Sequence, residues 1–144
     1  IPANDVAWLL GSSCASPVPS GANNQYHVED HPSATTSGMT DNLLRLHFTD
    51  GFDDLEWSFL TITLYDDEQG KSYTCSPNGN DCSIGEETTD TWWRGSEVIS
   101  IAEGGSTDIC GAIGGDEGSY CELTIIISYQ GAQLPAPIIS VQVT

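Results

Sequence analysis

Carboxylates in two short stretches are the side chains of this chain best suited to hold a metal ion. One stretch should connect two strands and the other should form a hairpin turn; together they supply Asp50, Asp53, Asp54, Asp66, Asp67 and Glu68. Calcium takes several hard oxygen ligands from a turn, so it is the ion that such loops could bind. Neither stretch has the D-x-D-x-D-G spacing and distant Glu of an EF-hand loop. Two interpretations stay open: a specific calcium site, or a solvated acidic surface.

The run HVEDH, residues 27–31, is the other group with metal-binding side chains. We expect His27 and His31 to face the same way only on a helix, and Pro32 with its Ser and Gly neighbours disfavours a helix. The H-E-x-x-H order of helical zinc sites is also absent. We therefore interpret this run as a solvated polar loop.

Trp92 and Trp93, beside Arg94, are the side chains best suited to bind a sugar or a protein partner. An exposed Trp stacks on sugar rings or anchors an interface. The alternative is core packing at the start of the next strand, because one Trp of an adjacent pair usually points inward. Trp8, in the apolar run IPANDVAWLL, is a third candidate for an interface.

No residue pattern indicates catalysis. The serines lack the G-x-S-x-G elbow of hydrolases, and Cys14 has no recognisable catalytic surroundings. A glycosidase uses two carboxylates, but with 21 Asp and Glu residues some pair will always look suitable. The prediction is that the protein is not an enzyme and has no catalytic residues.

The charge balance limits the partners. Three basic residues face 21 Asp and Glu, for a formal net charge of -18. Nucleic acids and anionic membranes require a basic surface, so both are excluded as partners. No apolar stretch approaches the ~20 residues that a membrane-spanning helix needs. The acidity fits either a surface adapted to salt or the binding of divalent cations.

Two pairs of cysteines are spaced for short disulfide loops. Cys75 and Cys82 bracket SPNGND, and Cys110 and Cys121 bracket GAIGGDEGSY, both rich in turn residues. Each disulfide should contribute roughly 2–3 kcal/mol and requires an oxidising compartment, which predicts an extracellular protein. Cys14 is left over, either as a buried thiol or as an intermolecular link. The chain starts without Met or a signal peptide, which is typical of a mature or trimmed product.

Short β-strands are the elements that must position these side chains. Residues 1–42 are predicted to be an irregular arm and connector, and residues 43–144 a β-sandwich domain. Alternating apolar residues predict strands at 43–48, 57–65, 72–76, 97–103, 121–129 and 138–144. In the fourth of these we expect Val98 and Ile101 near the core and Glu103 at the strand end. About seven short strands at this spacing predict an immunoglobulin-like sandwich of antiparallel sheets.

The order of several short motifs carries a family resemblance over residues 39–144. The motifs are MTDNLLRLHFTDGFDDLEWSFLTITL, YTC, NDCSIGE, TWWRGSEVISIAEGG, TDIC and CELTIIISYQG. In this order they resemble the extracellular domain of archaeal type IV pilins and archaellin-like proteins, in particular acidic versions from marine archaea. The resemblance implies an immunoglobulin-like head that packs against its neighbours in a filament. Such pilins also carry an N-terminal apolar helix that forms the filament core, and this chain does not include one.

Three functions are compatible with these features. The first is an extracellular structural or interaction domain that contacts copies of itself or other cell-surface proteins, with IPANDVAWLL as a contact arm or donated strand. The second is a calcium-dependent carbohydrate-binding or adhesion module that uses the Trp pair or the acidic loops. The third is a small secreted hydrolase, which no motif supports.

Overall fold

The computed structural model describes residues 21–51, 53–86, 90–111, 120–134 and 139–144. Within these ranges the chain forms eleven strands and one short 3-10 turn. They are β1 (Gln25–Asp30), β2 (Asn42–Asp50), β3 (Leu55–Glu56), η1 (Trp57–Phe59), β4 (Leu60–Asp66), β5 (Lys71–Ser76), β6 (Cys82–Glu86), β7 (Trp92–Trp93), β8 (Val98–Glu103), β9 (Cys121–Tyr129), β10 (Ala132–Gln133) and β11 (Ile139–Val143). In this described part, no helix has the length and hydropathy needed to span a bilayer.

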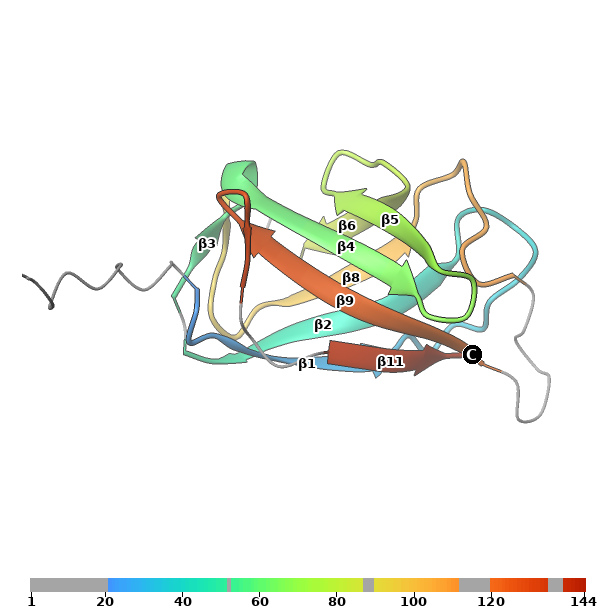
Figure 1. The fold of residues 1–144 in the computed structure, drawn as a ribbon, viewed down its shortest axis with the longest axis horizontal. Coiled ribbons are helices and arrows are strands. Elements are labelled where there is room, and N and C mark those ends of the chain that lie inside the picture. The colour runs from blue at the N-terminus through green and yellow to red at the C-terminus, as the bar shows by residue number, and fades with distance from the viewer. Residues whose placement is uncertain (1–20, 52, 87–89, 112–119, 135–138) are drawn as a thin grey trace, which may run out of the picture.

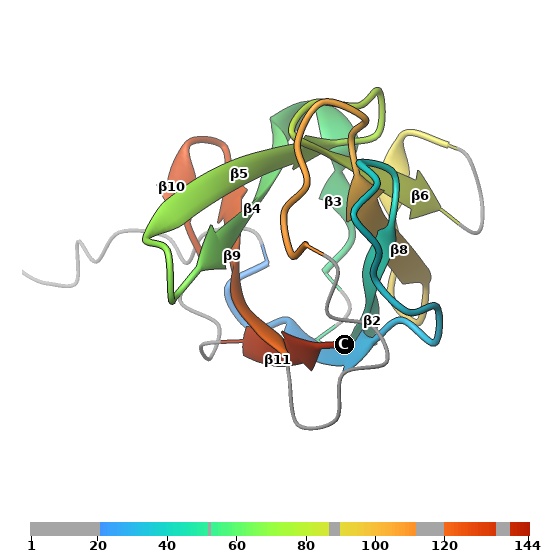
Figure 2. The same cartoon turned by 90° about the vertical axis from the view of Figure 1, so that its right-hand side faces the viewer.

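Nine of the strands form one sheet that curls into two facing layers (Figures 1 and 2). The order is β1-β2-β8-β6-β5-β4-β9-β10, with β11 on the same side of β9 as β10. The strand pairs are antiparallel except for β5 and β6, which pair in parallel through Cys75–Cys82 and Ser76–Ser83. The curl brings β11 beside β1 and leaves the core between the layers. The prediction of an all-β sandwich is therefore confirmed.

Alternation along the long strands builds the core. Every second residue of a strand faces the same side of the sheet, so apolar residues at alternate positions are buried together. The inward positions of β2, β4 and β9 include Leu44, Leu46, Phe48, Ile62, Leu64, Leu123, Ile125, Ile127 and Tyr129. The β-branched residues of β9 suit its position between β4 and β11.

The strand predictions missed β3, β6, β7 and β10, and three further details are wrong. Residues Gln25–Asp30, expected to be irregular, form β1 and pair along their length with β2. Residues Trp57–Phe59, expected to begin a strand, form η1, where the chain passes from the small β3–β7 sheet to the main sheet. In β8, the buried residues are Ile99, Ile101 and Glu103, because positions three apart on a strand face opposite sides.

Both predicted disulfides are present. Cys75–Cys82 joins β5 to β6 at their short parallel contact, with the Cα atoms 4.4 Å apart. Cys110–Cys121 joins the segment after β8 to the first residue of β9, with the Cα atoms 5.5 Å apart. The first bond thus fastens two neighbouring strands, and the second fastens the connection between β8 and β9, which are separated by three strands in the sheet. Cys14 lies outside the described residues.

Candidate functional site

The first acidic loop, which follows β2, is held by its own carboxylates and amides. The Gly21 N–H donates to Asp53 Oδ2 at 2.7 Å, and the Asp53 N–H donates to Oδ1 of the fully buried Asn24 at 2.9 Å. The Asn24 amide in turn donates to the Asp53 carbonyl. Asp50, at the end of β2, is exposed and accepts from the Gly51 N–H at 2.8 Å. These bonds fix the loop against the segment before β1.

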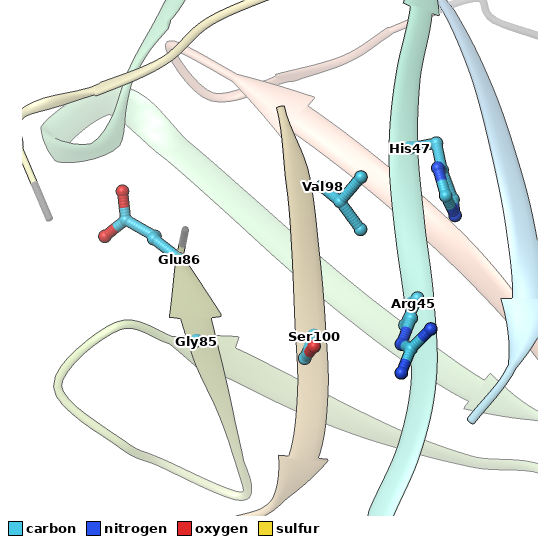
Figure 3. Close-up of a pocket in the computed structure, with 6 residues that line it drawn as sticks. All are labelled: Arg45, His47, Gly85, Glu86, Val98 and Ser100. Carbon is cyan, nitrogen blue, oxygen red and sulfur yellow. The ribbon is translucent and has the colours of Figure 1, made fainter. Parts of the chain in front are cut away.

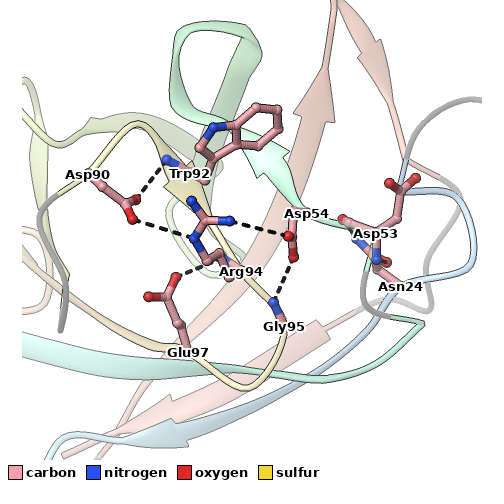
Figure 4. Close-up of polar contacts among 8 residues, drawn as sticks. All are labelled: Asn24, Asp53, Asp54, Asp90, Trp92, Arg94, Gly95 and Glu97. Carbon is pink, nitrogen blue, oxygen red and sulfur yellow. Dashed lines mark hydrogen bonds and ion pairs between the residues drawn. The ribbon is translucent and has the colours of Figure 1, made fainter.

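A network around Arg94 ties this loop to the turn after β7 (Figure 4). Asp54 accepts from the Gly95 N–H at 3.0 Å and lies 3.7 Å from an Arg94 guanidinium nitrogen. Asp90 lies 3.5 Å from Arg94 Nε, and Glu97 accepts from the Arg94 N–H at 2.7 Å. The ion pairs are exposed, so each contributes at most about 1 kcal/mol. Together these contacts connect the loop after β2 to the turn after β7.

The second acidic stretch caps the β4–β5 hairpin. Asp66 is buried, and its Oδ1 accepts from the N–H groups of Glu68 and Gln69 at 3.0 and 3.1 Å. Asp67 accepts from the Thr124 hydroxyl of β9 at 3.0 Å, while the Glu68 side chain is exposed. Asp66 therefore shapes the turn and Asp67 fastens it to the next strand. Calcium binding at either predicted stretch stays a prediction.

A different set of carboxylates comes together beside the end of β8. Among the described residues, Asp41, Glu103 and Asp108 are the one group of three metal-binding side chains whose ligand atoms all lie within 4.8 Å of one another. Glu103 is 3% exposed, and it accepts from the N–H groups of Asp41 at 3.0 Å and Ile109 at 2.6 Å. Burial, opposed by these two bonds and reinforced by neighbouring Asp108, raises the pKa of Glu103.

This carboxylate cluster anchors loops. Asp41 accepts from the N–H and hydroxyl of Thr36, both at 2.8 Å, and Asp108 accepts from the Gly111 N–H at 2.8 Å. The sequence interpretation missed the cluster because it expected Val98 and Ile101 near the core and did not assign Glu103 to the buried face of β8. The signal was present, since Glu103 continues the inward positions of Ile99 and Ile101.

Trp93 is a core residue, which corrects its prediction as a ligand or interface residue. Its side chain is fully buried, and its ring centroid lies 5.2 Å from that of Tyr26, 5.4 Å from Phe48 and 5.9 Å from Trp57. Burial raises the pKa of Tyr26 to about 12. Trp92 is half-buried, opposite Glu56 on β3, and stays a candidate for contact with a partner. Trp8 lies outside the described residues.

Trp57 was not predicted to be a binding residue, yet it lines a groove. Its indole N–H donates to Glu86 Oε1 at 2.6 Å, and one face of the ring stacks on Trp93. Burial raises the pKa of Glu86, although the bond from Trp57 opposes this effect. The groove has a volume of about 440 Å³ and is lined by Glu56, Trp57, Ser58, Leu60, Ser76, Pro77, Asn78, Glu86, Asp90 and Thr91. An indole beside carboxylates and amides is a surface on which a sugar ring can stack and hydrogen-bond.

Residues 27–30 of the HVEDH run belong to β1 instead of the predicted loop, and His31 follows the strand. His27 and Glu29 face one side of β1, and His27 lies directly opposite His47 of β2 with ring centroids 5.8 Å apart. Glu29 Oε1 lies 2.7 Å from His47 Nε2 and 3.9 Å from Arg45 Nη1. The bond with His47, and then the nearby positive charges, lower the pKa of Glu29. Residues two or four apart also share a face on a strand, which the expectation that only a helix would align His27 and His31 overlooked.

A shallow hollow continues this histidine-bearing face onto β8 and β6 (Figure 3). It has a volume of about 410 Å³ and is lined by Arg45, His47, Gly85, Glu86, Val98 and Ser100. Arg45 and His47 come from β2, and Val98 and Ser100 lie beside them on β8. One of the chain's three Lys and Arg residues therefore lies on the same face as two of its three histidines.

The fold and these sites define a disulfide-braced β-sandwich with an acidic surface. No protein-family model and no curated protein matches the sequence. Among solved structures, the chain is similar to self-complemented MyfA, the major subunit of Myf fimbriae from Yersinia enterocolitica. The two share 14% identity over 83% of this chain and 97% of that chain, with a TM-score of 0.44. A likeness of this degree does not assign the chain to a family.

Proposed function

We propose that this protein is an extracellular structural domain that assembles with copies of itself or docks on other cell-surface proteins. The disulfides Cys75–Cys82 and Cys110–Cys121 support a place outside the cytosol, since such bonds persist in oxidising compartments. The strongly acidic surface would keep the isolated domain soluble.

This proposal rests mainly on what the acidic side chains bind. Asp53, Asp54 and Asp66 each accept hydrogen bonds from backbone N–H groups of loops. A catalytic site would instead need groups that converge on a reacting atom with donors and acceptors to spare. Carboxylates that hold loops in place give a rigid, durable head, which is what an external building block requires.

The more specific proposal is the head of a filament subunit of the archaeal type IV pilin or archaellin-like kind. It rests on the order of motifs in residues 39–144. In this proposal, the apolar run IPANDVAWLL is the arm through which one head contacts the next, or a strand donated to a neighbour. That run lies within residues 1–20, outside the described residues.

The groove at Trp57 favours a second candidate function, a carbohydrate-binding or adhesion module. Trp57 combines a partly exposed ring with the neighbouring acceptor Glu86, which the buried Trp93 cannot do. Calcium dependence would come from the acidic loops. In this case the protein would respond to glycans as a monomer.

Light scattering coupled to size exclusion, over a concentration series with and without calcium, separates the two. Self-assembly predicts oligomers that grow with concentration and are lost when residues 1–20 are deleted. A monomer at every concentration would contradict self-assembly. Calorimetric titration with a glycan panel then tests the second function: Trp57→Ala should abolish binding, whereas the control Phe59→Ala, which removes an exposed aromatic ring that does not line the groove, should keep it.

A further inference from the structure

The exposed face of β1 and β2 carries an arrangement that the structural role does not require. All three histidines of the chain lie on this pair or at its end: His27 on β1, His31 just after it, and His47 on β2. From these positions we propose that His27 and His47, with Glu29, bind a divalent transition metal ion of the Zn²⁺ type.

The backbone holds the two imidazoles in register. His27 and His47 are direct partners in the antiparallel β1–β2 ladder, and His47 is in turn paired with Val98 of β8. Directly opposite residues have Cβ atoms about 4.5–5.5 Å apart, so their side chains meet without movement of the chain. The backbone therefore places the two imidazoles on neighbouring strands, but the ligand atoms of His27, His47 and Glu29 do not all lie within 4.8 Å of one another, so side-chain rotation must complete the site.

The ring positions suit one bridging ion. In a tetrahedral site with Zn–N bonds of about 2.1 Å, two imidazole centroids lie roughly 5 Å apart. The observed separation of 5.8 Å needs only a small side-chain rotation to reach this value. Neither ring is locked in the core, because His27 is exposed and His47 is 32% exposed.

Glu29 supplies the third donor. It lies two positions after His27 on the same face of β1, and its Oε1 is already 2.7 Å from His47 Nε2. A carboxylate in this place can bind the ion directly or accept the ring N–H of a coordinating imidazole, which fixes the tautomer. Two imidazoles and one carboxylate are an established donor set for zinc.

Arg45 determines which metal the site prefers. Its guanidinium lies 3.9 Å from Glu29 Oε1, so a cation held by charge alone is disfavoured here. Calcium and magnesium depend on charged oxygens, whereas zinc, copper and nickel bind well to neutral imidazole. The net charge of -18 raises the local concentration of all divalent cations, and the two imidazoles then select among them.

Calorimetric titration of the full chain with Zn²⁺, in a large excess of Ca²⁺ that occupies oxygen-only sites, tests this site. We expect one ion per chain and a loss of affinity of at least about tenfold in either His27→Gln or His47→Gln. The matched control is His31→Gln, which removes an imidazole from the end of the same strand and should leave the affinity unchanged. Circular dichroism melts establish that each variant folds; should His47→Gln unfold, the exposed His27 carries the test.

The position of the ion needs its own measurement. Paramagnetic Ni²⁺ should broaden the amide NMR signals of His27, Glu29 and His47 before any others in the wild type. Absence of Zn²⁺ binding in excess Ca²⁺ would overturn the proposal. So would affinity that survives both histidine substitutions, or that falls instead in Asp108→Asn, because the ion would then sit at the carboxylate cluster.

Discussion

Glu103 occupies the third inward-facing position of β8, after two isoleucines, and this makes it the acidic side chain with the clearest effect on stability. Burial and Asp108 raise the pKa of Glu103 above the ordinary 4.5. Between these two pKa values, Glu103 stays protonated in the folded protein but is ionised in the unfolded chain. The stabilising contribution of Glu103 is therefore fully present below pH 4.5 and is lost as the pH rises through the raised pKa.

Asp108→Asn should reduce this loss. Asparagine removes one negative neighbour of Glu103, can still accept from the Gly111 N–H, and offers an N–H to the ionised Glu103. We expect the variant to lose less thermal stability than the wild type between about pH 4 and about pH 7. Asp67→Asn, which removes one charge at the β4–β5 hairpin, is the control. Equal flattening in both variants would show a general charge effect and contradict the local explanation.

At the scale of elements, the Cys75–Cys82 disulfide closes a short join in the middle of the sheet. Only two residue pairs connect β5 to β6, and both cysteines are buried at 3% and 0% exposure. Removing this bond as Cys75→Ala with Cys82→Ala should lower the free energy of unfolding by roughly 2–3 kcal/mol from chain entropy, and further through the cavity left behind.

The second disulfide provides the comparison. Cys110 is only partly buried, so replacing both Cys110 and Cys121 by Ala should cost the entropic contribution with a smaller cavity effect. Urea denaturation of the two double variants measures the difference. If removal of Cys110–Cys121 destabilises the protein more, the β5–β6 join is not the weak point of the sheet.

How far the elements could be predicted depended on whether each strand could be recognised from its own residues. The alternation of Leu44, Leu46 and Phe48, and the β-branched run in β9, identify their strands without reference to the rest of the fold. β1 has the polar sequence QYHVED, and it is a strand because β2 offers it a full ladder. Such tertiary support is invisible in a local pattern.

The sites were harder to predict than the strands for the same reason. Of the carboxylates expected in the acidic loops, Asp50 and Asp66 are the last residues of β2 and β4. What the others bind depends on hydrogen-bond donors far away in sequence, as for Asp54 with the Gly95 N–H. Trp57 and Glu86 form one groove although 29 positions separate them. The sequence shows that polar and aromatic side chains are present. Which of them lie next to one another can be seen only in the folded structure.

At the scale of the whole molecule, the charge of -18 should make stability depend on salt. Repulsion among the carboxylates opposes the compact state, and monovalent salt screens it over a Debye length of about 10 Å at 0.1 M. We expect the melting temperature to rise with added NaCl. A flat response would show that the charges are already well spaced or ion-bound. A comparable rise in CaCl₂ at a far lower ionic strength than is needed with NaCl would instead indicate specific calcium binding.

The C-terminal end of the chain is fastened beside the end of β1, and this affects how the domain bears load. The Thr144 N–H and hydroxyl donate to Asp30, and the Thr35 N–H donates to the Thr144 carbonyl. In Figure 1, β1 and β11 run in the same direction, with the start of β1 and the C-terminus toward opposite ends of the long axis. Tension applied through these two ends would pull each terminal strand along its neighbour, loading the bonds of a ladder together in shear. A domain with this arrangement should resist mechanical unfolding better than one whose strands separate one hydrogen bond at a time.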